Sequence, residues 1–572
     1  MPRLEIRSST PHALRIAVAL GLFAGTALAP AACATATRPF EARAPRWEDD
    51  DRHPFRPAPE PFYSPFIWDG ADASFFRPLA EYWKFEAPRE AVNVNALDEV
   101  PDSSWFTNRV TRTPMSPTEV ARGACTPGSR PTPPWTVSSG KPDGSNPGFF
   151  ITDARGQRYL LKTDGEQQPE RPSAADTIGA AVYHAAGYFA PCNQVVYFDP
   201  SILRLAPDAE AKYTDGRVEP MTQAVIDRVL EKAASGSDGR LRASVSRFID
   251  ARPISPWRYE GIREDDPNDV VPHEDRRELR GMFVLAAWVD HVDSRQENTL
   301  AAWVETDDDG RGYVRHYLID FGDCFGQLAP WTPLSKRLGH SGYLDFEHVF
   351  VDFVTFGLID RPWFRAELGP AGATLGYYDA RRFEPDAWRP GYPNVAFGRR
   401  TERDAAWMAR IIARLREPHI EALVERARFS DPVDARELAR VMAGRRRAIL
   451  ERYLSRLSPL AHPRLEGNEL CLEDIAVSSG LLASAERSYA ARMWTDGRSR
   501  DRERRKARAI SARARGTDVC VQLPPDDALH VEVQTQPKDR AGPGPARLHL
   551  KPVDGRRAVV GLERPDPGAR LR

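Results

Sequence analysis

Two short stretches decide the fold of this chain: His291-Val-Asp293-Ser-Arg-Gln-Glu-Asn298 and, after an apolar run, Leu318-Ile319-Asp320-Phe321-Gly322. The first places an Asp and an Asn on one loop, where both side chains can face the same phosphates. The second places an Asp at the end of a buried strand, where a Gly allows a sharp turn. Phosphoryl transfer needs a carboxylate that orients the attacking group, and an Asn and an Asp that hold Mg²⁺ against the phosphates.

Each motif alone has an ordinary explanation, because Asp-Phe-Gly is a common strand-to-turn sequence and HxDxxxxN is a loose pattern. The segments between them read TLAAWVE, DDDGRG and YVRHYLIDFG, two apolar runs around an Asp/Gly turn. This pattern predicts a β-hairpin that returns Asp320 to the loop of Asp293 and Asn298. The combination is far less expected by chance than either motif.

A lysine upstream should complete such a site, and Lys162 ends the apolar strand predicted at 158–162. Lysine is scarce here, with nine in the chain against seventy-one arginines. A compact ammonium at the end of an apolar strand suits the phosphates of ATP. An edge-strand lysine that reaches solvent is the alternative.

The acid that would pair with Lys162 is sought in the small-residue segment 173–187, predicted to be a helix ended by Gly187. Asp176 is expected in its first turn, where it either pairs with Lys162 or only caps the helix. Glu166 and Glu170 are the alternatives.

A loop that covers phosphates is sought in the segment 138–148, where Gly144 and Gly148 are the candidate residues. Its glycines do not fit GxGxxG and two prolines interrupt it, so a plain turn is the alternative.

The set Lys162, Asp176, Asp293, Asn298 and Asp320 resembles the protein-kinase-like superfamily. The atypical branches are the most similar: HipA-type bacterial kinases, phosphoinositide kinases, and secreted Fam20 and CotH-type kinases. The resemblance covers residues 135–450 and implies an α+β, two-lobed protein-kinase-like fold, with a small antiparallel β lobe and a larger helical lobe. It implies Asp293 as the catalytic base, Asn298 and Asp320 as metal ligands, Lys162 as a phosphate contact, and as cofactors ATP or another nucleotide with Mg²⁺ or Mn²⁺.

Two departures from the family pattern limit what it implies. No Ala-Pro-Glu follows the Asp320 motif, which puts an ordinary peptide-binding platform in doubt. The catalytic loop reads His-Val-Asp and lacks the Arg that reads an activation-loop phosphate, which argues against that style of regulation.

The amino terminus indicates export. Three arginines precede an apolar stretch at 16–29 that is too short to span a bilayer, as in a secretory signal. It ends in Leu-Ala-Pro-Ala-Ala-Cys33, which resembles a bacterial lipobox although Pro30 stands where a Leu is usual. We expect lipidation at Cys33 and an anchor on the bacterial outer membrane, facing the periplasm or the cell surface. Ordinary signal cleavage is the alternative.

Composition fits a large globular protein that acts as a monomer: 572 residues, 41% hydrophobic, net charge −1. This charge gives no drive toward nucleic acid. The basic stretch 498–515 is interrupted by acids and is expected to be a solvated helix or loop. An oxidising compartment would permit a disulfide between Cys471 and Cys520, and Cys324 is a candidate buried thiol.

Six parts are predicted along the chain. They are a signal peptide at 1–33, a flexible linker at 34–60, an irregular extension at 61–134 docked on the first lobe by Trp105 and Phe106, an N lobe at 135–250, a helical C lobe at 251–460, and a small β-rich domain at 466–572. Within the C lobe, the acidic loop 264–269 is expected to cap a helix at 273–289 that delivers the catalytic loop.

The sequence therefore predicts an exported kinase-like phosphotransferase, or a nucleotidyl transferase, that acts on an unknown protein or small-molecule acceptor. A catalytically inactive kinase-like lipoprotein that serves as a binding or scaffolding module is the alternative.

Overall fold

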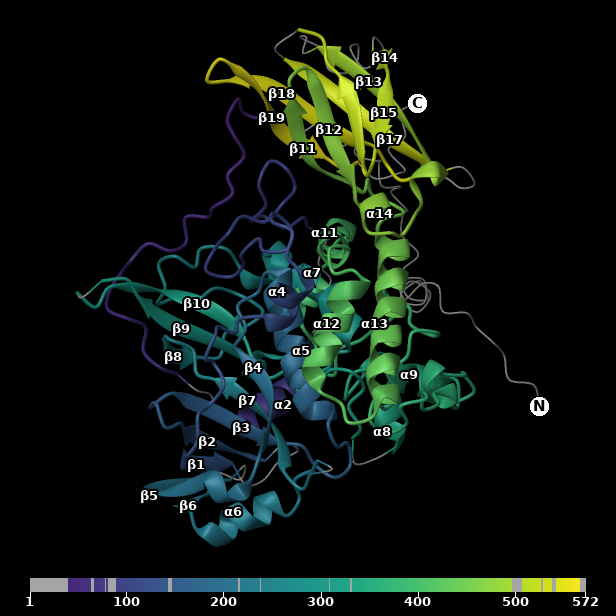
Figure 1. Cartoon of the computed structure of the whole chain (residues 1–572). Coiled ribbons are helices and arrows are strands. Elements are labelled where there is room, and N and C mark those ends of the chain that lie inside the picture. The colour runs from purple at the N-terminus through teal and green to yellow at the C-terminus, as the bar shows by residue number, and fades with distance from the viewer. Residues whose placement is uncertain are drawn as a thin grey trace, which may run out of the picture.

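The computed structural model describes residues 40–565, apart from gaps at 63–65, 78, 81–88, 142–146, 214–216, 237, 308, 330–331, 496–506, 526–527 and 538–541. The chain has a mixed α/β fold with several sheets. Figure 1 shows a large sheet at the bottom, a helical middle, and the C-terminal sheets at the top. The predictions at Cys33 and Gly144 lie outside the described residues.

A seven-stranded sheet, in the order β4-β7-β3-β2-β1-β5-β6, precedes the helical part. Its strands are β1 (Trp135–Lys141), β2 (Gly148–Thr152), β3 (Arg158–Thr163), β4 (Asn193–Phe198), β5 (Leu203–Lys212), β6 (Val218–Pro220) and β7 (Leu241–Arg247). The antiparallel prediction is wrong for one pair, because β1 and β5 are parallel. The chain reaches β5 through β2, β3, helix α5 (Arg171–Ala186) and β4, and so can enter from the same end. Helix α6 (Gln223–Leu230) packs its apolar residues on this sheet.

Helix α5 is buried on nearly every face and begins and ends as its sequence dictates. Pro172 lies in its first turn, and Gly187 ends it with a φ of 128°, a backbone that favours glycine. Small residues let neighbours approach closely: a Cβ on Gly179 would lie 2.5 Å from the Cβ of Phe321. This contact fixes α5 against the Asp320 motif.

The predicted hairpin is present as β9 (Thr299–Glu305) and β10 (Gly312–Leu318), which pair antiparallel. A third strand, β8 (Arg252–Ser255), pairs with the other edge of β9. Helix α7 (Arg277–Val289) precedes β9 and is buried throughout. The acidic loop does not cap it, contrary to the prediction. Asp269 instead lies 2.7 Å from His273 Nε2 in the turn before α7, because that buried imidazole requires a partner.

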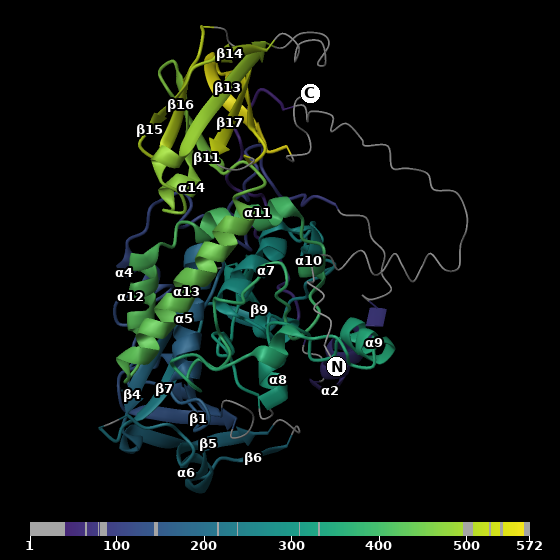
Figure 2. The same cartoon turned by 90° about the vertical axis from the view of Figure 1, so that its right-hand side faces the viewer.

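Further helices of the predicted C lobe follow the β9–β10 hairpin. They are α8 (Thr332–Arg337), α9 (Phe346–Val354), α10 (Val395–Gly398), α11 (Glu402–Ile412), α12 (Glu417–Ala427) and α13 (Pro432–Tyr453). Helix α11 packs on α7, and α12 packs between α5 and α13, as Figures 1 and 2 show. Of the described helices, none is long and apolar enough to cross a membrane.

The segments before β1 are docked along the molecule. The described part of the predicted linker is not a free tether: Asp51 accepts hydrogen bonds from Ser104, and Phe55 exchanges backbone bonds with Gly312. Short helices occur at α2 (Phe66–Ala71), η1 (Asp72–Phe76) and α4 (Pro117–Arg122). A disulfide joins Cys125 to Cys192, a pairing that the sequence did not reveal.

Trp105 and Phe106 are buried anchors, as predicted, but not on the first sheet. Trp105 stacks on His316 of β10 at 3.4 Å between ring centroids. Phe106 packs against Trp407 of α11 and Tyr188. The extension therefore docks on both predicted lobes, with Trp105 on β10, and with Phe106 on Tyr188 of the predicted N lobe as well as on α11.

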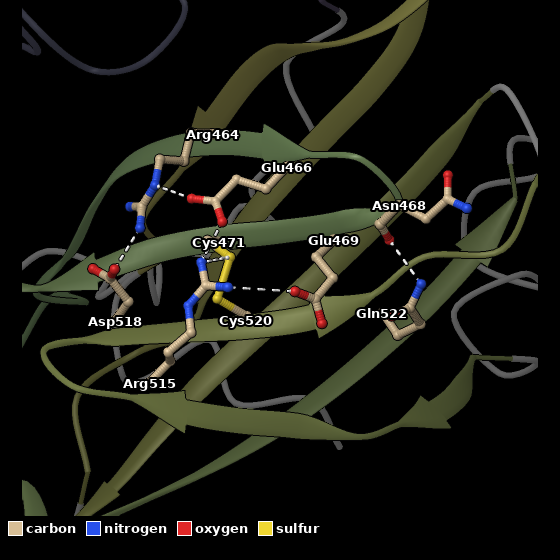
Figure 3. Close-up of a disulfide and its surroundings, with 9 residues drawn as sticks. All are labelled: Arg464, Glu466, Asn468, Glu469, Cys471, Arg515, Asp518, Cys520 and Gln522. Atoms are coloured by element: carbon tan, nitrogen blue, oxygen red, sulfur yellow. Dashed lines mark hydrogen bonds and ion pairs between the residues drawn. A yellow bond between two sulfur atoms is a disulfide. The ribbon is translucent and has the colours of Figure 1, made fainter.

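The C-terminal part forms two sheets. The strands are β11 (Leu460–Glu466), β12 (Glu469–Asp474), β13 (Arg487–Thr495), β14 (Arg508–Ile510), β15 (Ala512–Arg515), β16 (Asp518–Gln522), β17 (Leu529–Pro537), β18 (Ala546–Val553) and β19 (Arg556–Glu563), with the short helix α14 (Ile475–Ser478). The Cys471–Cys520 disulfide joins register partners on β12 and β16 (Figure 3). Part of the basic stretch is strand, not helix or loop, because β14 pairs with β13 and β15 with β16.

Candidate active site

In the loop after α7, Asp293 and Asn298 are joined by hydrogen bonds. Asp290 ends α7 in a left-handed conformation with φ 58°. Asn298 Nδ2 then donates to the carbonyl of Asp293 at 2.8 Å and to its Oδ2 at 3.0 Å. The amide nitrogen is thereby pinned, which leaves Asn298 Oδ1 as the atom available to a ligand.

The Asp320 motif meets this loop and the first sheet. Ile319 N donates to the carbonyl of Asn298 at 3.0 Å, and Asp320 turns left-handed with φ 58°. Lys162 Nζ on β3 lies 2.8 Å from Asp320 Oδ1. The side chain of Asp320 is 43% exposed and that of Lys162 is 17% exposed, so solvent reaches the pair.

Electrostatics keeps this pair ionised. Burial disfavours both charges, but the ammonium of Lys162 outweighs it and lowers the pKa of Asp320 below its usual value. In turn, the charges of Asp320 and Asp176 raise the pKa of Lys162 despite its burial.

Asp176 lies in this site but not in the place that the sequence predicted. It is in the second turn of α5, which begins at Arg171, so it does not cap the helix. Its Oδ1 accepts from Phe321 N at 3.3 Å. No ion pair within 4 Å joins it to Lys162, although both are among the described residues. Burial, together with the charge of Asp320, raises the pKa of Asp176 against the opposing charge of Lys162.

The two alternatives to Asp176 are elsewhere. Glu170 Oε2 accepts from Ser430 N at 2.9 Å, which holds it at the end of α5 away from Lys162. Glu166 lies in the loop between β3 and α5 and does not line the cavity that contains Lys162.

Asp323 is a site residue that the sequence analysis missed. Its Oδ2 accepts from Asp293 N at 2.8 Å, and its Oδ1 lies 3.4 Å from His291 Nε2. Burial raises the pKa of Asp293 to about 7, although the charge of Arg295 opposes this shift. Burial also raises the pKa of Asp323 to about 7. The nearby carboxylate of Asp320 adds to both shifts. An acid directly after the Asp-Phe-Gly turn was the available signal.

Arg295 is the second residue that was missed. Its Nε lies 2.9 Å from Asp293 Oδ1, without the alignment of a hydrogen bond, and its guanidinium covers the ring of Tyr392. An arginine two residues after the proposed base was the available signal, because guanidinium groups suit phosphate.

Gly148 has a structural reason to be glycine. It is the register partner of Lys162, and a Cβ there would lie 2.2 Å from the carbonyl oxygen of Leu161. The close approach of β2 and β3 therefore excludes any side chain. Gly148 also lines the cavity, so a ligand contact stays a prediction.

A cavity of about 860 Å³ opens beside these residues, between the first sheet and the β8–β9 pair. One end carries Lys162, Asp176 and Asp320. The other walls are largely apolar: Phe150, Leu160, Phe248, Ile249, Leu300 and Ile319. A flat apolar body attached to an anionic tail would match this division.

The cluster has more negative than positive charge. Of its four carboxyl groups, Asp320 pairs with Lys162 and Asp293 pairs with Arg295. Asp176 and Asp323 feel only the more distant charges of Lys162 and Arg171, respectively. Burial lowers the pKa of His291 to about 4, so its imidazole adds no charge near pH 7.

Three buried carboxylate oxygens of this cluster have no hydrogen-bond donor among the described residues. They are Asp176 Oδ2, Asp293 Oδ1 and Asp323 Oδ1. Mg²⁺ and Mn²⁺ prefer such oxygen ligands, and a cation would relieve the excess negative charge.

Comparison with known proteins gives little beyond this geometry. No family model matches the chain, and no curated protein matches it. The solved structures that are similar include the Golgi casein kinase and the same kinase with Mn/ADP bound. Each is 11% identical and covers 57% of this chain and 75% of its own, with TM-scores of 0.22 and 0.23. At these values we infer function from the side chains of the site alone.

Proposed function

We propose that this chain is an exported, metal-dependent phosphotransferase of the kinase-like type that uses a nucleotide as donor. One observation carries the proposal: residues chosen from sequence motifs far apart in the chain come together. Lys162 pairs with Asp320 in the lining of one cavity, and Asn298, which is bonded to Asp293, accepts a hydrogen bond from Ile319 N beside Asp320. The acceptor is a protein or small molecule of unknown identity.

Each residue has a role that its surroundings support. The apolar walls of the cavity would hold the nucleobase, and Lys162 would bind the phosphates. Asn298 Oδ1 and Asp320 would hold Mg²⁺ or Mn²⁺, which neutralises phosphate charge when bound. Asp293, whose pKa burial raises to about 7, can accept the proton of an acceptor hydroxyl at neutral pH. Arg295 adds a cation beside it.

The proposed location of the protein limits which phosphate donor is available to it. The proposed lipid anchor at Cys33 would hold the protein at the bacterial outer membrane, where ATP is scarce. Transfer of a nucleotidyl group, or use of another nucleotide, is therefore part of the same proposal, and the binding test should cover several nucleotides.

Nucleotide binding tests the proposal most directly. With Mg²⁺ or Mn²⁺ and nucleotide at 100 times Kd, thermal unfolding should show about 2.7 kcal/mol of stabilisation. Asp320→Ala should abolish this effect, because a metal ligand carries the charge that holds the phosphates. Asp293→Ala should keep it but lose transfer about 100-fold or more, because a base orients the acceptor. Asp307→Ala, on the β9–β10 turn, is the matched control.

Several outcomes would decide between the candidates. Unimpaired transfer by both variants, or transfer without a divalent cation, would contradict the roles of Asp293 and Asp320. Nucleotide-dependent stabilisation without transfer to any acceptor would instead support the inactive binding module. No stabilisation by any nucleotide and metal would contradict the proposal as a whole.

A further inference from the structure

Helix α9 is amphipathic, but most of its apolar side chains face solvent. Its sequence is FEHVFVDFV, and Val351 is its only buried residue among those described. Val349, Phe350, Phe353 and Val354 are exposed, Phe353 to 78%. A helix that stabilises a core would present these side chains inward. Figure 2 shows α9 at the edge of the molecule.

Two polar side chains of α9 have partners in the segments that flank the helix. His348 Nδ1 lies 3.1 Å from Ser341 Oγ, and Asp352 Oδ1 accepts from Arg361 at 2.7 Å. Asp345 caps the helix by accepting from His348 N. The orientation is therefore fixed by specific bonds.

The exposed apolar surface extends beyond α9. Phe356 is 90% exposed and held left-handed at φ 53°, a backbone that costs free energy for an aromatic residue. The ring of Phe75 in η1 lies 5.9 Å from that of Phe346, which joins the two segments. We call the aromatic face the set of exposed residues Trp68, Phe75, Phe76, Val349, Phe350, Phe353, Val354, Phe356, Leu358 and Phe364.

We propose that the aromatic face docks on the surface of a lipid bilayer. An amphipathic helix that turns its apolar side outward is the form that lies in a membrane interface. A bilayer also accepts an exposed apolar surface without the shape complementarity that a protein partner needs. The choice of lipid rests on the proposed anchor at Cys33, which would keep the chain beside a membrane.

Docking there would bring the catalytic loop close to the lipid. Tyr343, just before α9, donates its N–H to the carbonyl of Gly391 at 2.7 Å, and Gly391 N donates to that of Val292 at 2.7 Å. Val292 adjoins Asp293. The docked segment is thus bonded to the loop that would receive the acceptor.

The surrounding charges indicate which lipids are needed. Arg361 is paired with Asp352, and Arg77 with Asp72 at 2.7 Å. These paired cations give little attraction for anionic headgroups, so apolar burial should dominate. Binding should then occur on neutral lipid and resist salt.

Vesicle co-sedimentation tests the proposal. The full chain carrying Cys33→Ser removes any covalent lipid, and neutral phosphatidylcholine vesicles are the probe. In this background, Phe353→Ser with Phe356→Ser should weaken partitioning about tenfold or more, because both rings lose their burial in lipid. Val218→Ser with Val270→Ser removes two exposed apolar residues elsewhere and should leave partitioning unchanged.

The results separate this proposal from its competitors. Equal partitioning of the two double variants would overturn it, as would binding only to anionic vesicles that is lost in 0.5 M salt. Self-association of the parent that Phe353→Ser with Phe356→Ser abolishes would show a second copy as the occupant. Nucleotide-dependent stabilisation should be the same in all variants, and its failure would contradict the transferase while leaving the vesicle result intact.

Discussion

The acidic cluster at the cavity and the buried carboxylate of Asp98 use the same kind of residue in opposite ways. Asp98 accepts hydrogen bonds from Arg277 and, at 2.6 Å, from Arg564, and Arg410 Nη2 lies 3.8 Å away. Burial disfavours its charge, but these arginines outweigh it and lower the pKa of Asp98 below its usual range. In the acidic cluster, Asp293 Oδ1 and Asp323 Oδ1 accept no hydrogen bond from any described residue, and burial raises the pKa values of both carboxyl groups to about 7.

Asp98 is a carboxylate that joins parts of the fold, whereas the acidic cluster contains carboxylates whose charge a ligand could balance. Asp98 joins the N-terminal extension, α7, α11 and the end of the C-terminal sheets through three arginines. Its charge is satisfied within the chain. In the acidic cluster, the charge of Asp320 instead adds to the raised pKa values of Asp293 and Asp323, and such perturbed groups are common at functional sites.

The largest expected effect is on folding. Asp98→Asn should lower the free energy of unfolding by about 3–5 kcal/mol, because it leaves Arg564 buried without the carboxylate that it pairs with and leaves Arg277 paired with Asp404 alone. Asn suits the left-handed backbone at this position, where φ is 62°, so the change tests charge alone.

Chemical denaturation of the purified protein measures this change. Asp307→Asn is the control, because its pair with Arg311 is largely exposed and should contribute less than about 1 kcal/mol. A similar loss in both variants would mean that Asp98 does not hold the parts together.

A smaller effect concerns acid pH. Because the folded-state pKa of Asp98 lies below its unfolded value near 3.8, its contribution is present above pH 4 and lost as the pH falls further. The parent should lose about 2–3 kcal/mol more than Asp98→Asn between pH 5 and pH 2. Thermal unfolding at several pH values measures this, and parallel profiles would contradict the assigned shift.

The smallest effect has the opposite sign and belongs to the cavity. The folded-state pKa of Asp323 is about 7, above its unfolded value of 3.8, so its contribution is fully present below pH 4 and lost as the pH rises through 7. Asp323→Asn can still accept from Asp293 N but carries no charge. It should therefore stabilise the metal-free protein at pH 8 by about 1–2 kcal/mol.

Unfolding in the presence of a chelator is the measurement, at pH 5 and pH 8. Stabilisation of the variant should appear at pH 8 and be small at pH 5. A loss of stability at pH 8 would show that the ionised Asp323 is paired in solution, and the contrast with Asp98 would fail.

The local patterns in this sequence predicted local structure well. The β9–β10 hairpin and the strand that carries Lys162 follow from apolar alternation and turn residues. The prediction that Cys471 can pair with Cys520 is confirmed by their position on adjacent strands. The roles of Asp293, Asn298 and Asp320 stay predictions.

Other features depend on segments far apart and could not be predicted. Asp323 is significant only because the turn after Phe321 brings it to Asp293. The partner of Cys125 depends on how the extension docks, and the docking of Trp105 on His316 depends on a surface built by β10. The exposure of α9 is equally hidden, because its apolar pattern is that of an ordinary core helix.

Candidate catalytic and metal-binding residues could be chosen from the sequence, because such roles depend on side-chain type and on short spacings such as that from Asp293 to Asn298. The tertiary structure determines which of these carboxylates form ion pairs. Burial and distance set those pairings, and both depend on contacts between segments such as α5 and the Asp320 turn, or the extension and Arg564. The same carboxylate is a structural link at Asp98 and a ligand-ready group at Asp293 for that reason.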